Sequence, residues 1–250
     1  MTEFTAADMV LLIPLAAILL LLTLGHFREK TWKARMESGT DPAARLKSYN
    51  ETMGLLWLTA IVATVCWVAS GRSLDEMGFG MTHGSWRGGL AWGATVAATG
   101  YMIWAIVESS LSRKARSSAR KQVDAMGGLE SIRPRTTAEH NRFVALAITA
   151  GITEEIIFRG FLIMALASLM PIWLAAILSI AAFTLGHLYQ GVSGLIRVFP
   201  TALILTLVFL IGGSLWPVII IHAALDLAGG GVFRVLDRHA EADAAAEPAT

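Results

Sequence analysis

Long apolar stretches separated by short polar ones dominate this sequence. A helix needs about 20 apolar residues to cross the ~30 Å hydrocarbon core of a bilayer, and seven segments reach or approach that length. They run approximately over residues 9–24, 53–69, 86–107, 143–169, 172–188, 195–211 and 215–232. The pattern predicts an all-α polytopic membrane protein with about seven transmembrane helices. Whether the chain has an eighth, re-entrant segment stays open.

The spacing of these segments divides the chain into three parts. Very short connections separate the last four segments, so we expect a compact helical core over residues 143–233. Residues 1–142 precede it with three transmembrane helices and basic loops. The tail, residues 234–250, is rich in Ala and Glu and is expected to be disordered. The basic stretch 109–141 is expected to be a solvated connector that faces lipid headgroups at the cytoplasmic surface.

Composition supports a membrane protein and excludes other classes. Hydrophobic residues make up 55% of the chain and charged residues 16%. The formal net charge is only +1 and no nucleic-acid-binding motif is present, so we set nucleic-acid binding aside. The single cysteine, Cys66, lies in an apolar run, which leaves no disulfide framework and no cysteine-rich zinc cluster.

Basic residues predict the orientation in the membrane. They are concentrated in the loops 26–52 and 108–142, and loops rich in Lys and Arg are typically cytoplasmic. The first apolar segment follows Glu3 and Asp8 without a basic region before it, which is typical of an uncleaved span and not of a secretory signal. Seven spans then place the N-terminus outside and the C-terminus in the cytoplasm. The Ala-rich, tightly looped chain looks bacterial, so we expect the inner membrane.

A few ionisable residues interrupt the apolar pattern of the core. Each charge at the membrane centre costs roughly 2.5 to 3.5 kcal/mol, so Glu154, Glu155, Arg159 and Asp226 together cost on the order of 10 kcal/mol before pairing. Such a cost indicates pairing, function or both.

Helical spacing shows which of these residues can meet. Glu155 and Arg159 are four residues apart and can form an ion pair on one helix face. Glu154 is rotated by about 100° from Glu155 and needs a different environment. Two further pairs, Phe183 with His187 and His222 with Asp226, have the same four-residue spacing on later segments. Three helices can therefore direct polar groups toward one point.

Carboxylates and imidazoles that converge in a cavity can activate a water molecule and stabilise an oxyanion. They can instead bind a divalent metal such as zinc, for which Glu154, His187, His222 and Asp226 are the candidate ligands. The His-Glu-x-x-His motif is absent, so this is not a zincin. The residues alone leave three interpretations open. They are a hydrolase, an ion or proton carrier, and a purely structural role for each pair.

The same residues resemble the motifs of the CAAX prenyl protease and bacteriocin-processing (CPBP, or Abi) family of intramembrane endopeptidases. Residues 154–160 read E-E-I-I-F-R-G and are similar to the family's E-E-x-x-x-R motif. Residues 183–187 read F-T-L-G-H and resemble F-x-x-x-H, and residues 222–226 read H-A-A-L-D and resemble H-x-x-x-N/D. The resemblance covers about 143–232, with the motifs in the family's order.

The resemblance implies a helical fold around a water-filled cavity open to the cytoplasm, and cleavage of a membrane-associated or lipidated polypeptide. It makes Glu154 the base that activates water, oriented by His187. It makes His222 and Asp226 the pair that stabilises the oxyanion or binds a metal, with Glu155, Arg159 and Phe183 as support. Asp226 stands where the family often has Asn, which favours a metal or a protonated Asp and puts a simple amide-donor role in doubt.

Two alternative functions would use the same residues without proteolysis. One is a membrane scaffold or immunity protein that binds a partner through the cavity, and the other is an ion or proton carrier. The depth of the residues offers a check, because Glu154 and His222 are both expected roughly 16 Å from the cytoplasmic side. His187 reaches that depth only if its helix continues past Tyr189.

Overall fold

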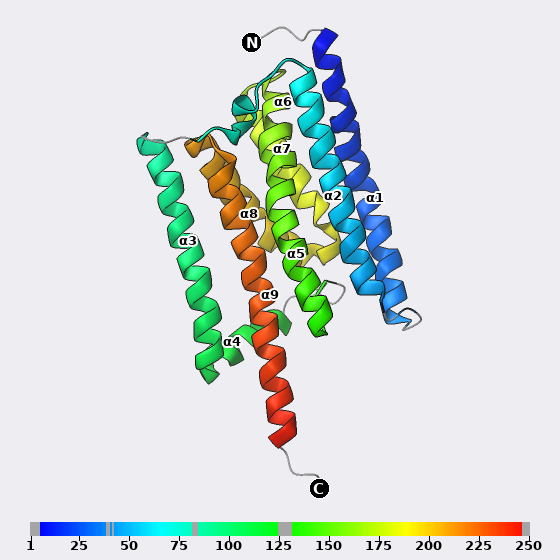
Figure 1. The fold of residues 1–250 in the computed structure, drawn as a ribbon, viewed down its shortest axis with the longest axis vertical. Helices are drawn as coiled ribbons and strands as arrows, with labels where there is room; N and C mark the ends of the chain where they lie inside the picture. Colours follow the sequence, from blue (N-terminus) through cyan, green and yellow to red (C-terminus); the bar gives the residue numbers. More distant parts are fainter. Residues whose placement is uncertain (1–5, 39–40, 42, 82–84, 125–131, 247–250) are drawn as a thin grey trace.

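The computed structural model describes residues 6–38, 41, 43–81, 85–124 and 132–246. All regular structure within these ranges is helical, which confirms the predicted all-α class. The long helices run roughly side by side, with α1 and α2 at one edge of the view and α3 at the other (Figure 1).

The N-terminal part supplies three long helices. They are α1 (Leu12–Glu37), which follows the short 3₁₀ helix η1 (Ala6–Leu11), α2 (Ala44–Ala69) and α3 (Trp86–Leu111). A short π-helical turn, η2 (Asp75–Phe79), lies between α2 and α3. Helices α1 and α2 pack against each other, whereas α3 packs against α8 and α9.

The core begins with one continuous run of helix. A capping box in which Thr136 and Glu139 bond each other's backbone N–H groups starts α5 (Thr137–Glu154). The helix then widens into the π-helix η3 (Glu155–Ile163) and returns to α form in α6 (Met164–Ala167). Pro171 precedes α7 (Ile172–Gly186).

The chain then turns sharply into its last two long helices. The single 3₁₀ turn η4 (Leu188–Gln190) connects α7 to α8 (Gly191–Gly212). Gly213, in the left-handed region at φ 66°, ends α8. The final helix, α9 (Leu215–Ala246), packs mainly on α5 and α3.

Four helical stretches are long and apolar enough to cross a membrane: Ala44–Ala69, Trp86–Leu111, Leu188–Gly212 and Leu215–Ala240. Shorter apolar helices cover Met9–Thr23 and Ile172–Gly186. The remaining predicted segment, 143–169, lies in the continuous helix of α5, η3 and α6 and carries three charges. All seven predicted segments are thus largely helical, while their number as membrane spans stays a prediction.

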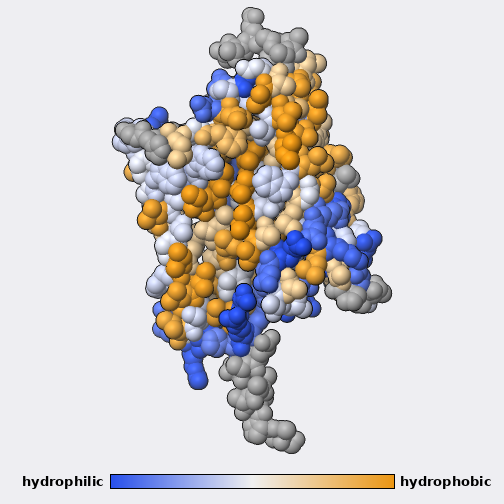
Figure 2. Space-filling model, in the orientation of Figure 1, coloured by the Kyte–Doolittle hydropathy of each residue, from blue (hydrophilic) through white to orange (hydrophobic). Residues whose placement is uncertain are grey.

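The outer surface suits a lipid environment. Large apolar side chains point outward, including Val96 at 72% and Ile196 at 70% exposure. Figure 2 shows apolar residues over much of the upper and middle surface, with hydrophilic residues mainly in the lower half. Exposed apolar area on this scale is explained by contact with lipid.

Two polar segments are more ordered than the sequence predicts. The prediction of a disordered tail from residue 234 is wrong up to Ala246, because α9 continues as a helix to that residue. The basic connector contains a helix, α4 (Arg113–Asp124), with no buried residue. Alanine has the highest helix propensity, and the tail after Arg238 consists largely of Ala, Glu and Asp.

Glycine brings the two central helices close together. A Cβ atom on Gly151 of α5 would lie 2.7 Å from the backbone nitrogen of Ala223 of α9. Because no side chain separates the backbones there, Glu154, one turn beyond Gly151, faces His222 across the same contact.

Candidate active site

The three polar groups predicted from the sequence meet inside the helical core. Glu154 and Glu155 lie where α5 passes into η3, and His222 and Asp226 lie one turn apart on α9. His222 Nε2 is 3.9 Å from Glu154 Oε2 and 3.8 Å from Asp226 Oδ2. The Phe183 ring of the second motif lies 4.7 Å from the His187 ring and 5.9 Å from the His222 ring, so the convergence that the helical spacing predicted is present.

Glu155 is the centre of the hydrogen-bond network. Its Oε1 accepts a 2.8 Å bond from Arg159 Nη1 and a 2.7 Å bond from His222 Nδ1, and its side chain is fully buried. The predicted ion pair with Arg159 is thus present, but Glu155 also binds the histidine of the third motif. A buried charge pair is stabilised only when further hydrogen bonds complete it, and His222 supplies one here.

Arg159 is held from three sides. Besides Glu155, it donates to Thr206 Oγ1 at 3.4 Å and to the Ala202 carbonyl at 3.2 Å, both on α8. Its guanidinium carbon lies 4.4 Å from the centre of the Phe183 ring of α7. One fully buried side chain thereby ties η3 to α7 and α8.

The π-helical stretch η3 carries this network. All nine of its residues are buried, and the ring of Phe158 packs edge-on against Phe183 at 5.2 Å. Ser179 of α7 donates to the Phe158 carbonyl at 2.8 Å. π-helical turns are rare and occur frequently at functional sites, where they turn side chains out of the regular helical register.

Glu154 differs from its neighbour in having no such anchor. Its side chain is 14% exposed and makes no hydrogen bond with the described residues. Its buried Oε2 lacks a partner there, as does Oε2 of Glu155, but Glu155 is held through its Oε1. Glu154 lines the central cavity, together with His187, His222 and Asp226. A buried carboxylate oxygen without a partner needs an explanation, and a water molecule or substrate group in the cavity would provide one.

His187 reaches the site in a different way from the one the sequence suggested. The expectation that its helix must continue past Tyr189 is wrong, because α7 ends at Gly186. At 1.5 Å per residue the 15 residues of α7 span only about 22 Å, which is less than the ~30 Å core of a bilayer. The short helix ends at the cavity, and the ring of His187 stacks on Phe183 at 4.7 Å.

Each histidine has one ring nitrogen that already donates a hydrogen bond within the protein. His187 Nδ1 lies 2.9 Å from the carbonyl of Phe183, which can only accept, so this nitrogen carries the hydrogen. His222 Nδ1 likewise donates to Glu155. In the neutral ring of His187, Nε2 is therefore the nitrogen with the lone pair. The carboxylates of Glu154, Glu155 and Asp226 around His222 instead favour its cationic form, in which Nε2 also carries a hydrogen.

The cavity extends well beyond the polar residues. Its volume is about 380 Å³, and α1, α2, α5, α7 and α9 contribute to its walls. Lining residues recur along α5 from Glu154 down to Phe143, a distance of about 16 Å, and along α9 from His222 to Phe233. The walls between these ends are largely apolar, with Leu146, Ala147 and Ala150 among them.

The donor set does not fit a bound metal. Among the residues that the structure describes, no group of three or more His, Cys, Asp or Glu side chains is arranged to hold an ion. Zinc needs about three protein ligands near 2 Å from one point, and the described residues provide no such grouping.

Several contributors to the site lay beyond sequence reasoning. Thr206 and Ala202 complete the environment of Arg159, and Tyr189 and Gln190 line the cavity after His187. Trp32 and Tyr49 show that α1 and α2 take part in the cavity walls. These residues carry no periodic or charge signal, because they become neighbours only when the helices pack.

The helices, their apolar outer surfaces and the buried Glu and His residues define an integral membrane protein with an intramembrane polar site. Residues 139–228 match the family described as type II CAAX prenyl endopeptidase Rce1-like. The resemblance to the CPBP family is confirmed by this match, which includes all three motifs. Neither a curated protein nor a solved structure matches the chain.

Proposed function

We propose that this protein is an intramembrane endopeptidase in which Glu154 activates the attacking water. The family match supports protease activity, and one observation supports the role of Glu154 in particular. Its carboxylate lines the cavity, makes no hydrogen bond with the described residues, and lies 3.9 Å from His222 Nε2. A general base needs such an open acceptor within reach of water.

In the proposed reaction, water binds between Glu154, whose carboxylate accepts one of its hydrogens, and Nε2 of His187, whose lone pair accepts the other. Glu154 takes one proton while the water oxygen attacks the peptide carbonyl, and the carbonyl electron pair moves onto its oxygen. The tetrahedral intermediate then collapses as the C–N bond breaks. The proton held by Glu154 passes to the leaving nitrogen, which releases an acid and an amine.

Glu155 has a positioning role in this scheme. Because it accepts from His222 Nδ1, it fixes the ring orientation that directs Nε2 to the cavity. Arg159 in turn fixes Glu155. Two adjacent carboxylates thus have different roles because their partners differ.

The cavity supports a membrane-associated or lipidated polypeptide as the substrate class. About 16 Å of groove accommodates about five residues of extended chain at 3.3 Å each, or an acyl or prenyl chain of similar length. Its middle section is apolar, and the surrounding helices are apolar on their outer faces. Such a groove favours ligands that partition into the bilayer.

The experiment compares membrane proteomes of cells that produce the wild-type protein, Glu154→Ala, or Glu37→Gln as a matched control. Glu37 lies at the end of α1, with its side chain 67% exposed, and takes no part in the site. We expect one precursor polypeptide to accumulate in Glu154→Ala cells alone. Normal processing in those cells, with the variant inserted at wild-type levels, would defeat the proposal.

Treatment of the purified protein with a metal chelator adds a second test. The proposed mechanism uses no metal, so cleavage should persist after chelation and dialysis. Loss of cleavage that zinc restores would contradict the glutamate mechanism but not the proposed endopeptidase activity.

A further inference from the structure

A short basic helix, α4, lies apart from the site described above. Five of its twelve residues are Arg or Lys, and its acidic residue is Asp124. No residue of α4 is buried, so a hydrophobic core does not hold this helix in place. Its position must therefore depend on specific bonds to its neighbours.

The turn that leads into α4 is fixed by side-chain bonds at the end of α3. Ser112 separates the two helices with an extended backbone (φ −104°, ψ 121°), and its Oγ accepts a 3.3 Å hydrogen bond from the backbone N–H of Ala115. Arg116 Nη1 donates to the carbonyls of Ser109 at 3.3 Å and Ser110 at 2.8 Å. The last carbonyls of a helix have no partner within it, so Arg116 completes the end of α3 and fixes the angle of the turn.

Helix α4 crosses the ends of the long helices and does not continue the direction of α3 (Figure 1). Arg120 Nη2 holds it to α9 by donating to the Leu236 carbonyl at 3.4 Å. Ala115, Ala119 and Val123 are half-buried and four residues apart, so they form the side of α4 that is turned toward the protein.

The lipid-facing surface of α3 indicates the depth of α4 in the membrane. Helix α3 is long and apolar enough to cross a bilayer, and its outward apolar side chains continue to its last residue, Leu111, which is 77% exposed. Arg113 starts α4 two residues later, at the boundary between hydrocarbon and headgroups. The headgroup layer is only about 5 to 8 Å thick on each side, so a helix about 18 Å long stays within it only when it lies across the bundle.

The basic residues of α4 that make no bond within the protein lie on one face. At 100° per residue, Arg113, Lys114 and Lys121 fall within an arc of about 100°, opposite the side turned toward α3 and α9. All three are exposed, and none makes a hydrogen bond or ion pair with the described residues. Asp124 lies on the same arc, so this face carries three positive charges against one negative charge.

Basic residues of α1 at the same end of the molecule differ because they are paired. Arg28 Nε lies 2.8 Å from Glu51 Oε1, and Lys33 Nζ lies 3.9 Å from Glu37 Oε1. Their charge is balanced within the protein, whereas the charge on the outer face of α4 is left for an external anion.

We propose that the face of α4 formed by Arg113, Lys114 and Lys121 binds the phosphate headgroups of anionic phospholipids in the surrounding bilayer. Phospholipid phosphates lie at the level of α4, and a lipid with a net negative charge complements cations that have no partner in the protein. The exposed apolar side chains of Val107 and Leu111 on α3 lie next to the acyl chains of such a lipid. The inference goes beyond the proposed endopeptidase function and does not depend on it.

The test measures lipid binding to purified full-length protein in detergent by native mass spectrometry. Phosphatidylglycerol is the anionic probe, and phosphatidylcholine, which has no net charge, is the reference. We expect the wild-type protein to bind phosphatidylglycerol more tightly. The combined substitutions Arg113→Gln, Lys114→Gln and Lys121→Gln should weaken that binding by about 10- to 100-fold and leave phosphatidylcholine binding unchanged, because each cation near an anionic surface contributes about fivefold.

A matched control removes the same charge from the same end of the molecule. It combines Lys30→Gln, Lys33→Gln and Lys47→Gln on the exposed ends of α1 and α2. This variant should bind phosphatidylglycerol within about threefold of wild type. Equal losses in the two variants would show a general effect of net charge and overturn the inference.

Asp124→Asn tests the same face by a gain of binding. Removal of its one carboxylate should tighten phosphatidylglycerol binding by up to about fivefold, and this test stands even if the triple variant of α4 fails to fold. Unchanged binding in Asp124→Asn and in the triple variant would overturn the inference. Displacement of the lipid by glycerol 3-phosphate, which has the phosphate but no acyl chains, would also overturn it by showing a site for soluble anions.

Glu154→Gln in the same binding assay keeps the two proposals distinguishable. This variant should bind phosphatidylglycerol as the wild-type protein does, whether or not it cleaves a polypeptide. Loss of lipid binding in the triple variant of α4 with wild-type proteolysis would support the lipid site alone.

Discussion

Neighbouring carboxylates at the end of α5 have opposite environments. Glu155 is fully buried and bonded through Oε1 to Arg159 and His222, whereas Glu154 lines the cavity and makes no hydrogen bond with the described residues. The difference follows from the roughly 100° rotation between successive residues of a helix, which directs one side chain to η3 and α9 and the other to the cavity. Stability and catalysis should therefore separate between the two positions.

Conservative amide substitutions test that separation. Glu155→Gln removes the charge that balances Arg159, so we expect a loss of about 3 to 5 kcal/mol in unfolding free energy, because it leaves a buried cation unpaired. Glu154→Gln breaks no hydrogen bond within the described residues, so its stability should stay within about 1 kcal/mol of wild type. Thermal unfolding in detergent measures both.

Catalytic activity and stability should change differently in the Glu154→Gln and Glu155→Gln variants. Glu154→Gln should lower kcat by about 10²- to 10⁴-fold while remaining as stable as wild type. Equal destabilisation by the two substitutions would show that Glu154 is structural.

Helix contacts decide whether these residues meet at all. The residues of the site come from the end of α5, from η3, from α7 and its C-cap His187, and from α9, and α5 and α9 approach closely through Gly151 and Ala223. The hydrophobic pattern correctly predicted the helices but not their internal irregularities. The π-helical form of η3 and the end of α7 at Gly186 depend on packing against neighbours, which periodicity along one segment does not report.

Gly151→Ala tests the close approach of α5 and α9. The added Cβ would lie 2.7 Å from the Ala223 backbone, so the helices must separate and move Glu154 away from His222. We expect a loss of about 1 to 3 kcal/mol in stability, together with a clear drop in kcat.

Gly93→Ala is the matched control for that substitution. Gly93 lies on α3 and a Cβ there meets nothing within 4 Å, so unchanged or slightly increased stability is expected. Both variants are measured by thermal unfolding and peptide cleavage. A Gly151→Ala protein that behaves like the Gly93→Ala protein would show that the contact is not needed.

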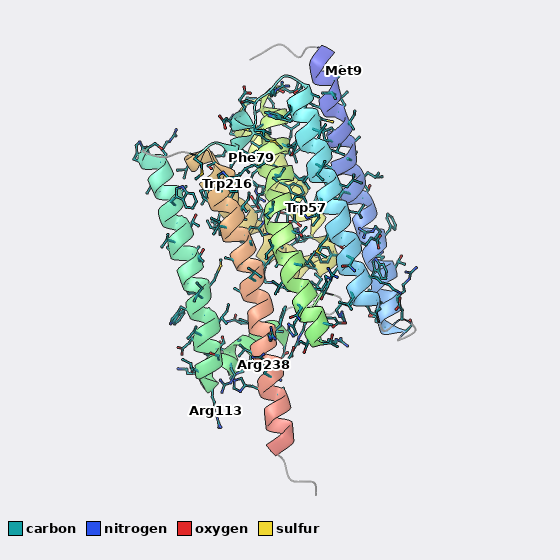
Figure 3. The ribbon with its side chains drawn as sticks, viewed as in Figure 1. Met9, Trp57, Phe79, Arg113, Trp216 and Arg238 are labelled. Atoms are coloured by element: carbon teal, nitrogen blue, oxygen red, sulfur yellow. The ribbon has the colours of Figure 1, made fainter. Side chains whose placement is uncertain are left out.

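Charge is distributed unevenly between the two ends of the molecule. Figure 3 places Arg113 and Arg238 near one end and Met9 at the other. The basic helix α4 lies beside the lower ends of α3 and α9 (Figure 1). Arg120 of α4 donates a hydrogen bond to the Leu236 carbonyl of α9 at 3.4 Å. The orientation predicted from the loops places this basic end in the cytoplasm, and it stays a prediction.

Labelling of single cysteines tests the orientation. With Cys66 replaced by Ala, Met81→Cys near the start of α3 and Ser117→Cys on α4 place thiols at opposite ends, and both positions are exposed. A membrane-impermeant maleimide should label Met81→Cys in intact spheroplasts and Ser117→Cys only after permeabilisation. The reverse pattern would show that the basic end lies outside.

The sequence by itself determined the helical class, the places of the apolar segments and the residues Glu154, Glu155, Arg159, His187, His222 and Asp226. These properties are local, because apolar length, four-residue spacing and the cost of charge in lipid are read from neighbouring positions. The tertiary structure decided the partners of those residues. The bond from His222 to Glu155, the contacts of Arg159 with α8, and the place of Gln190 beside the cavity join segments up to 67 residues apart. Such contacts depend on how helices pack, and no pattern along one helix specifies them.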